Sequence, residues 1–174
     1  MNSNIEYGLL RRTAFKPGKL RGAGTWDVVI SAFNQSQRVR EPFDELVSTE
    51  KHWIVHPEYD FGEADLPTNG YLHRSTARDE AEFWYEYFTE VAADGWNTGA
   101  RICIDITGFM RPHLMLALRL FRDRGFDRIW MIYSDPMSYA KGAKTHFTKG
   151  AVTEVRQVRG FEGVHEHDAG ISIS

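Results

Sequence analysis

The segment Ala100-Arg-Ile-Cys-Ile-Asp-Ile-Thr-Gly108 is the most informative part of the sequence, because an apolar run ends there in a polar turn. The apolar centre Ile102-Cys103-Ile104 predicts a core strand over residues 100–106. The turn at Thr107-Gly108 leads into a segment with helical apolar spacing, residues 111–124. A strand, a tight turn and a helix in this order form the repeating unit of α/β proteins with a mostly parallel sheet.

The rest of the chain repeats this unit. Ser36 is the predicted N-cap of a helix over residues 37–47, although Pro42 suggests that this helix starts later. Thr76 is the predicted N-cap of a second helix, over residues 77–93. The pattern predicts a Rossmann-like three-layer α/β sandwich with a mostly parallel sheet. The expected strands cover residues 26–33, 52–56, 100–106 and 128–133.

The two ends of the chain differ from this pattern. Residues 1–23 are expected to form a basic arm, and residues 24–174 a single Rossmann-like domain. Residues 151–158 alternate between apolar and polar side chains, which predicts an antiparallel edge hairpin at the C-terminal end. The alternation at Ile171–Ser174 suggests that the natural chain continues beyond Ser174.

Composition narrows the class of protein. A net charge of −3 over 174 residues argues against a general nucleic-acid-binding surface. A single cysteine, Cys103, permits neither an internal disulfide nor a cysteine-based zinc site. No apolar run approaches the roughly 18 residues that span a bilayer, and the N-terminus lacks a signal-peptide pattern. We therefore expect a cytoplasmic protein without a membrane partner.

Polar residues follow every predicted strand, and ligands of open parallel sheets bind at the carboxyl ends of the strands. A helix N-terminus after Gly108, which permits a positive φ, would favour an anion, and Arg111 offers phosphate a charged fork. Asp105 could equally do no more than cap the helix and fix the turn. The candidate residues are Ser31, Asn34, Ser36, His56, Glu58, Asp105, Thr107, Gly108, Arg111, Ser134 and Asp135.

The segment Asp105-Ile-Thr-Gly-Phe-Met-Arg111 resembles the motif Asp-x-Thr-Gly-Gly-x-Lys/Arg of CARF domains. These are Rossmann-like sensors of cyclic oligonucleotides in CRISPR and related anti-phage systems. Phe109 stands at the motif's second glycine. The resemblance implies that Asp105, Thr107, Gly108 and Arg111 are ligand-loop positions, and more loosely that Ser31, Asn34 and Ser36 form a second ligand loop.

The resemblance also implies a biological role. It suggests a nucleotide-sensing module of a prokaryotic defence system that binds a cyclic oligonucleotide or another nucleotide. CARF-like domains usually form homodimers with the ligand across the two-fold axis, and an effector protein or domain would be a further partner. No cofactor is expected.

Two other functions stay open. One is a small nucleotide-processing hydrolase or nuclease, with Asp105 or Asp135 as a base beside His56 or His146 and with Ser31 or Ser134 as nucleophile. The other is a non-catalytic interaction domain of a larger complex. The run His165-Glu166-His167-Asp168 has a zinc-like alternation but no firm third ligand, so we expect a solvated turn there and no metal site.

Overall fold

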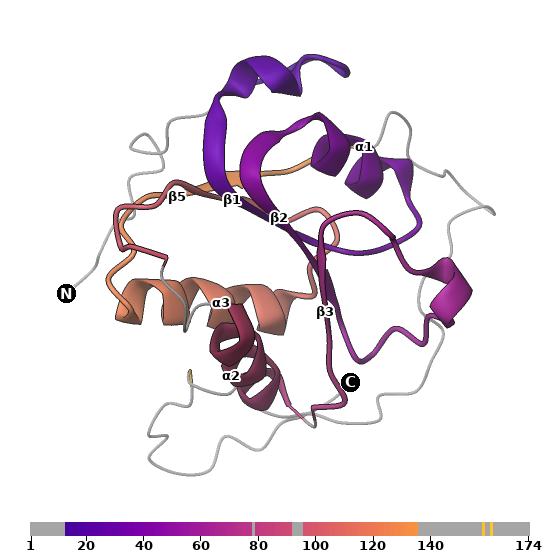
Figure 1. Cartoon of the computed structure of the whole chain (residues 1–174), viewed down its shortest axis with the longest axis vertical. Coiled ribbons are helices and arrows are strands. Elements are labelled where there is room, and N and C mark those ends of the chain that lie inside the picture. Colours follow the sequence, from indigo (N-terminus) through magenta and orange to yellow (C-terminus); the bar gives the residue numbers. More distant parts are fainter. Residues whose placement is uncertain (1–12, 78, 92–95, 136–157, 159–160, 162–174) are drawn as a thin grey trace, which may run out of the picture.

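The computed structural model describes residues 13–77, 79–91, 96–135, 158 and 161. They form a five-stranded parallel sheet in the order β3-β2-β1-β4-β5, covered by helices, which confirms the predicted α/β class (Figure 1). The elements are η2 (Leu20–Ala23), β1 (Thr25–Ala32), α1 (Gln37–Glu45), β2 (Val47–Val55), η3 (Glu63–Asp65), β3 (Tyr71–Arg74), α2 (Glu80–Val91), β4 (Ile102–Asp105), α3 (Arg111–Asp123) and β5 (Ile129–Ile132).

The four predicted strands are present, and the sheet has a fifth strand that the sequence did not reveal. β3 is only four residues long and buries only His73 fully, so it carries no apolar run. β2 begins at Val47 rather than at residue 52. The sequence did not predict its first half, because that half is largely exposed and polar and only residues 52–55 are buried. The two central strands, β1 and β4, have the continuous apolar character of strands covered on both faces.

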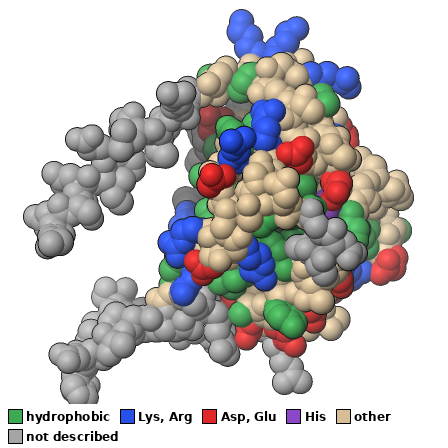
Figure 2. Space-filling view, turned by 60° about the vertical axis from the view of Figure 1, so that its left-hand side comes forward, with side chains coloured by type: hydrophobic (Ala, Val, Ile, Leu, Met, Phe, Trp, Pro, Cys, Tyr) green, Lys and Arg blue, Asp and Glu red, His purple; other side chains and the backbone are tan. Residues whose placement is uncertain are grey.

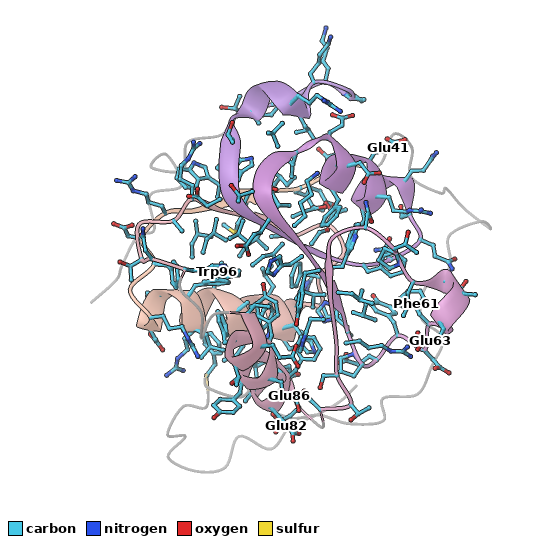
Figure 3. The ribbon with its side chains drawn as sticks, in the orientation of Figure 1. Glu41, Phe61, Glu63, Glu82, Glu86 and Trp96 are labelled. Carbon is cyan, nitrogen blue, oxygen red and sulfur yellow. The ribbon has the colours of Figure 1, made fainter. Side chains whose placement is uncertain are left out.

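The helices form two layers around the sheet (Figure 1). α1 covers one face and buries Val39 and Phe43 against side chains of β1 and β2. α2 and α3 cover the other face with a larger apolar cluster that includes Trp84 and Phe121. Trp96, labelled in Figure 3, stacks its ring on Phe121 with centroids 6.3 Å apart.

The helix boundaries correct two predictions. Ser36 does cap α1, since its Oγ accepts a hydrogen bond from the Arg38 N–H at 3.3 Å. Pro42, however, lies inside α1 and is buried, so the helix starts where its cap predicts rather than later. α2 begins after Asp79, whose Oδ1 accepts from the Ala81 and Glu82 N–H groups, so Asp79 and not Thr76 is the capping residue.

Several predictions concern residues outside the described part of the chain. These include the antiparallel hairpin at 151–158, most of the basic arm and the histidine pair at 165 and 167; the described sheet itself is entirely parallel. None of the described helices has the length and apolar character needed to cross a bilayer. Acidic and basic side chains are interspersed over the face seen in Figure 2.

Candidate functional site

Two central strands end in a buried hydrogen-bonded pair. Ser31 and Asp105 are register partners of β1 and β4, and the Ser31 hydroxyl lies 3.1 Å from Asp105 Oδ2. Asp105 Oδ1 accepts the Thr107 N–H at 3.0 Å, which fixes the turn after β4. Burial raises the pKa of Asp105, although the hydrogen bonds from Thr107 and Ser31 oppose this shift. Both side chains are fully buried, so in this conformation they shape the loop rather than touch a ligand.

Gly108 brings the loop after β4 against the end of β1. Its φ is not positive, which corrects the sequence-based expectation. The need for glycine is steric, because a Cβ at this position would lie 2.2 Å from the Ala32 carbonyl oxygen and 3.1 Å from Asn34 Nδ2. The next residue, Phe109, turns inward and packs edge-on to the His56 ring, with centroids 5.4 Å apart. The loop is therefore held on both sides by packing.

The same loop is joined to the end of β5. Thr107 Oγ1 accepts the Ser134 N–H at 2.9 Å. Arg38 Nε donates to the Ser134 carbonyl oxygen at 3.0 Å, and its Nη2 donates to the same oxygen. The Arg38 charge also favours the ionised form of Asp105 and so lowers its pKa. Arg38 was missed because only the apolar face of its helix was considered.

The remaining predicted residues lie around this centre. Asn34 Oδ1 accepts the Ser36 N–H at 2.9 Å, so both serve the turn that leads into α1. Arg111 begins α3, is exposed, and forms no ion pair with the described residues. Met110 precedes it without a side-chain cap. The structure thus brings together Ser31, Asn34, Asp105, Thr107, Gly108 and Ser134, with Ser36 and Arg111 at the edge.

A second group of polar residues lies on the other side of the loop after β4. His56 follows β2, Glu58 lies two residues further, and His113 is in the first turn of α3. One ligand atom from each of the three lies within 4.8 Å of the others. His113 Nε2 is 3.3 Å from Glu58 Oε1, and the two imidazole centroids are 4.4 Å apart. Both histidines are buried, whereas the Glu58 side chain is 43% exposed and gives the group a side open to solvent.

The state of His56 is set by its surroundings. Its Nε2 accepts the Met110 N–H at 3.3 Å, so a neutral ring carries its proton on Nδ1. Nδ1 has no hydrogen-bond partner among the described residues. Burial, and to a lesser degree the neighbouring His113, lower the pKa of His56 to about 3. The ring is therefore uncharged at neutral pH, as a general base or a metal ligand must be.

The sequence singled out His56 and Glu58 but not His113. The three residues have no motif spacing, because His113 reaches the group only through the placement of α3 beside β2. Asp135, one of the two predicted bases, is exposed after β5, and His146, the alternative to His56 beside the base, lies outside the described residues. No family model, curated protein or solved structure matches this chain.

Proposed function

We propose that the protein is a sensor that binds a phosphate-containing nucleotide at the carboxyl ends of β1 and β4. The strand order carries this proposal. The chain runs outward from β1 to β2 and β3 on one side and crosses to β4 and β5 on the other. The loops after β1 and β4 diverge at such a switch point, which is where doubly wound sheets bind their ligands.

The groups around this point suit a phosphate. α3 has 13 residues, and its N-terminus lacks a side-chain cap, so the N–H groups of Arg111 and His113 favour an anion, whereas Pro112 between them has no N–H to donate. Arg111 is exposed at the same end and can pair with a phosphate oxygen. Ser31, Asp105 and Thr107 hold the loop in shape, which reduces the ordering cost of binding.

The class of nucleotide in this proposal comes from the resemblance to CARF domains. The motif Asp105-Ile-Thr-Gly-Phe-Met-Arg111 suggests a cyclic oligonucleotide, a homodimer and a role in anti-phage defence with an effector partner. Phe109 replaces the motif's second glycine, and its ring packs into the core. The backbone of the loop contacts the end of β1 at Gly108.

Thermal unfolding with added nucleotides tests the proposal. Cyclic oligonucleotides, dinucleotides of the NAD type and mononucleotides are compared at equal concentration. A ligand at 100 times its Kd adds about 2.7 kcal/mol to the free energy of unfolding. We expect a rise in Tm with the cyclic class, and no rise with any nucleotide would contradict the proposal.

Two arginine variants locate the site. Arg111→Ala removes the exposed charge beside the loop and should abolish most of the rise. Arg122→Ala is the matched control, since it removes another exposed arginine, from the last turn of the same helix. An equal loss in both variants would indicate general charge attraction rather than a site at the loop.

A second function, hydrolysis of a bound nucleotide, is favoured by one observation. The uncharged imidazole of His56 lies with Glu58 and His113 beside the same loop, on the side away from Ser134. Chromatography of the nucleotide after incubation separates the two functions, because a sensor returns it unchanged and a hydrolase does not.

A further inference from the structure

We propose that His56, Glu58 and His113 form a binding site for a divalent transition metal ion of the zinc class. The proposal rests on the placement of these side chains and does not depend on nucleotide binding. Among the described residues, they form the group whose nitrogen and carboxylate ligand atoms all lie within 4.8 Å of one another.

The spacing fits a metal better than it fits a simple ion pair. Zinc lies about 2.0–2.2 Å from nitrogen and oxygen ligands, so two ligand atoms of a tetrahedral site are roughly 3.3 Å apart. The distance from His113 Nε2 to Glu58 Oε1 is 3.3 Å. This separation is longer than the 2.7–2.9 Å of a charge-assisted hydrogen bond. The pair already has the separation that a shared ion requires.

The three elements that carry these residues give the site a rigid and an adaptable part. The two imidazoles are held by the end of β2 and the first turn of α3, and their rings are packed at 4.4 Å. Both rings also lie near Phe83, which restricts their movement. Glu58 is on the loop after β2 and reaches inward from solvent. A carboxylate on such a loop can close on an ion that two fixed imidazoles have bound.

His56 supplies an independent sign that a ligand is missing. The ring is fully buried, yet Nδ1 has no hydrogen-bond partner among the described residues. Its other nitrogen, Nε2, accepts only a long 3.3 Å hydrogen bond from the Met110 N–H. A buried polar atom without a partner costs about 1–3 kcal/mol. Coordination through Nδ1 would move the ring proton to Nε2 and displace the long hydrogen bond from the Met110 N–H, so the bond to the ion replaces a weak contact and gives Nδ1 a partner.

The ligand types indicate the metal. Two imidazole nitrogens and one carboxylate oxygen suit zinc or a neighbouring first-row ion and suit calcium or magnesium poorly. Three protein ligands leave a fourth position, which in zinc sites of this composition is taken by water or substrate. Glu58 is the exposed member of the three, so water or substrate would reach a bound ion from its side.

Metal binding to the whole chain, freed of metal by dialysis against a chelator, tests this proposal. Cobalt(II) is added first, because the intensity of its visible absorption reports tetrahedral nitrogen and oxygen ligands. Zinc is then titrated against a chromogenic chelator. We expect one ion per chain and a higher Tm. Absence of stoichiometric binding would overturn the proposal.

The variants separate this site from others. Glu58→Gln keeps the side-chain shape on an exposed loop, so the variant should fold, and it should weaken binding at least about tenfold. Glu90→Gln is the matched control, since Glu90 also faces a buried histidine, His73, at 3.0 Å. His165→Ala/His167→Ala tests the other histidine pair of the sequence. Binding that survives Glu58→Gln, or that disappears only in the last variant, would refute the assignment.

Discussion

Two histidine–glutamate pairs lie on the same face of the sheet and share composition but not surroundings. In each, a histidine that is about 1% exposed meets a carboxylate that is about half exposed: His113 with Glu58, and His73 with Glu90. Both histidine rings pack against Phe83, at centroid distances of 5.0 and 4.7 Å. The pairs are thus matched in burial, chemistry and aromatic neighbour.

They differ in what else reaches the carboxylate. Glu90 Oε2 accepts the Tyr71 hydroxyl at 2.6 Å and also meets His73 Nδ1, and these contacts lower its pKa. Glu58 instead faces a second imidazole, that of His56, which brings no charge and has a nitrogen without a partner. The contrast lies in the carboxylates, because His73 Nε2 also has no hydrogen-bond partner among the described residues. Glu90 has a hydroxyl donor beside its histidine, whereas Glu58 has a second, uncharged imidazole. The neighbours, and not the pair itself, distinguish a structural contact from a candidate site.

The two regions are expected to differ most in how the free energy of unfolding depends on pH. The folded-state pKa of His56 is about 3, below its ordinary value of 6.5, so the unfolded chain binds the proton more readily. The contribution of the uncharged His56 ring to the free energy of unfolding is therefore fully present above pH 6.5. It falls by about 1.4 kcal/mol per pH unit as the pH drops toward 3. The Glu90 carboxylate, whose pKa is lowered, stabilises the fold above its ordinary pKa of 4.5, and this contribution is lost only as the pH falls below that value.

Urea unfolding at several pH values measures this slope. His56→Leu should remove most of it between pH 6.5 and 4.5 and leave the part due to His52, whose pKa burial also lowers. An unchanged slope in His56→Leu would show that its ring is accessible to protons in the folded state.

The next effect concerns the pair of His73 and Glu90. Tyr71→Phe removes the donor at 2.6 Å from Glu90 and should lower the free energy of unfolding by about 1 kcal/mol, the net value of one hydrogen bond. Glu58→Gln in metal-free protein should change it by less than about 0.5 kcal/mol. Equal losses in the two variants, measured by urea unfolding without metal, would remove the distinction between the regions.

The smallest effect sets the scale for an exposed ion pair. Arg74 follows His73 on β3, and its Nη1 lies 2.6 Å from Oε1 of Glu63, which is labelled in Figure 3. The Glu63 side chain is 88% exposed, so Glu63→Gln should cost at most about 1 kcal/mol and less at high salt. A larger loss would mean that this pair orders the loop between β2 and β3.

The sequence predicted the architecture because the central strands have buried apolar runs and the helices have clear apolar periodicity. The caps were less informative, since only Ser36 caps its helix as predicted. It also predicted that Ser31 and Asp105 would lie at the same edge of the sheet, and they are hydrogen-bonded there. β3 was missed because four residues with a single buried side chain carry no period. Gly108 was expected to serve the turn because glycine permits a positive φ, whereas its φ is not positive and its role is to allow contact with Ala32.

The candidate site was less accessible to prediction than the fold. His113 is 57 positions beyond His56 in the sequence, and only the docking of α3 beside β2 brings the rings together. Arg38 likewise meets Ser134 across 96 residues. Such contacts depend on tertiary packing, which a single sequence does not encode at any fixed spacing. Strand-end positions, in contrast, follow from chain order alone.

The five-residue loop that links β4 to α3 makes three contacts in succession. Thr107 holds Ser134, Gly108 rests on Ala32, and Met110 donates to His56. A shift of this segment would therefore change its contacts with Ser134 and with His56 at the same time. A nucleotide on one flank and a metal ion on the other would alter each other's affinity by the same factor, as linkage requires. The packing that fixes the loop thus provides a route for communication between the two proposed sites.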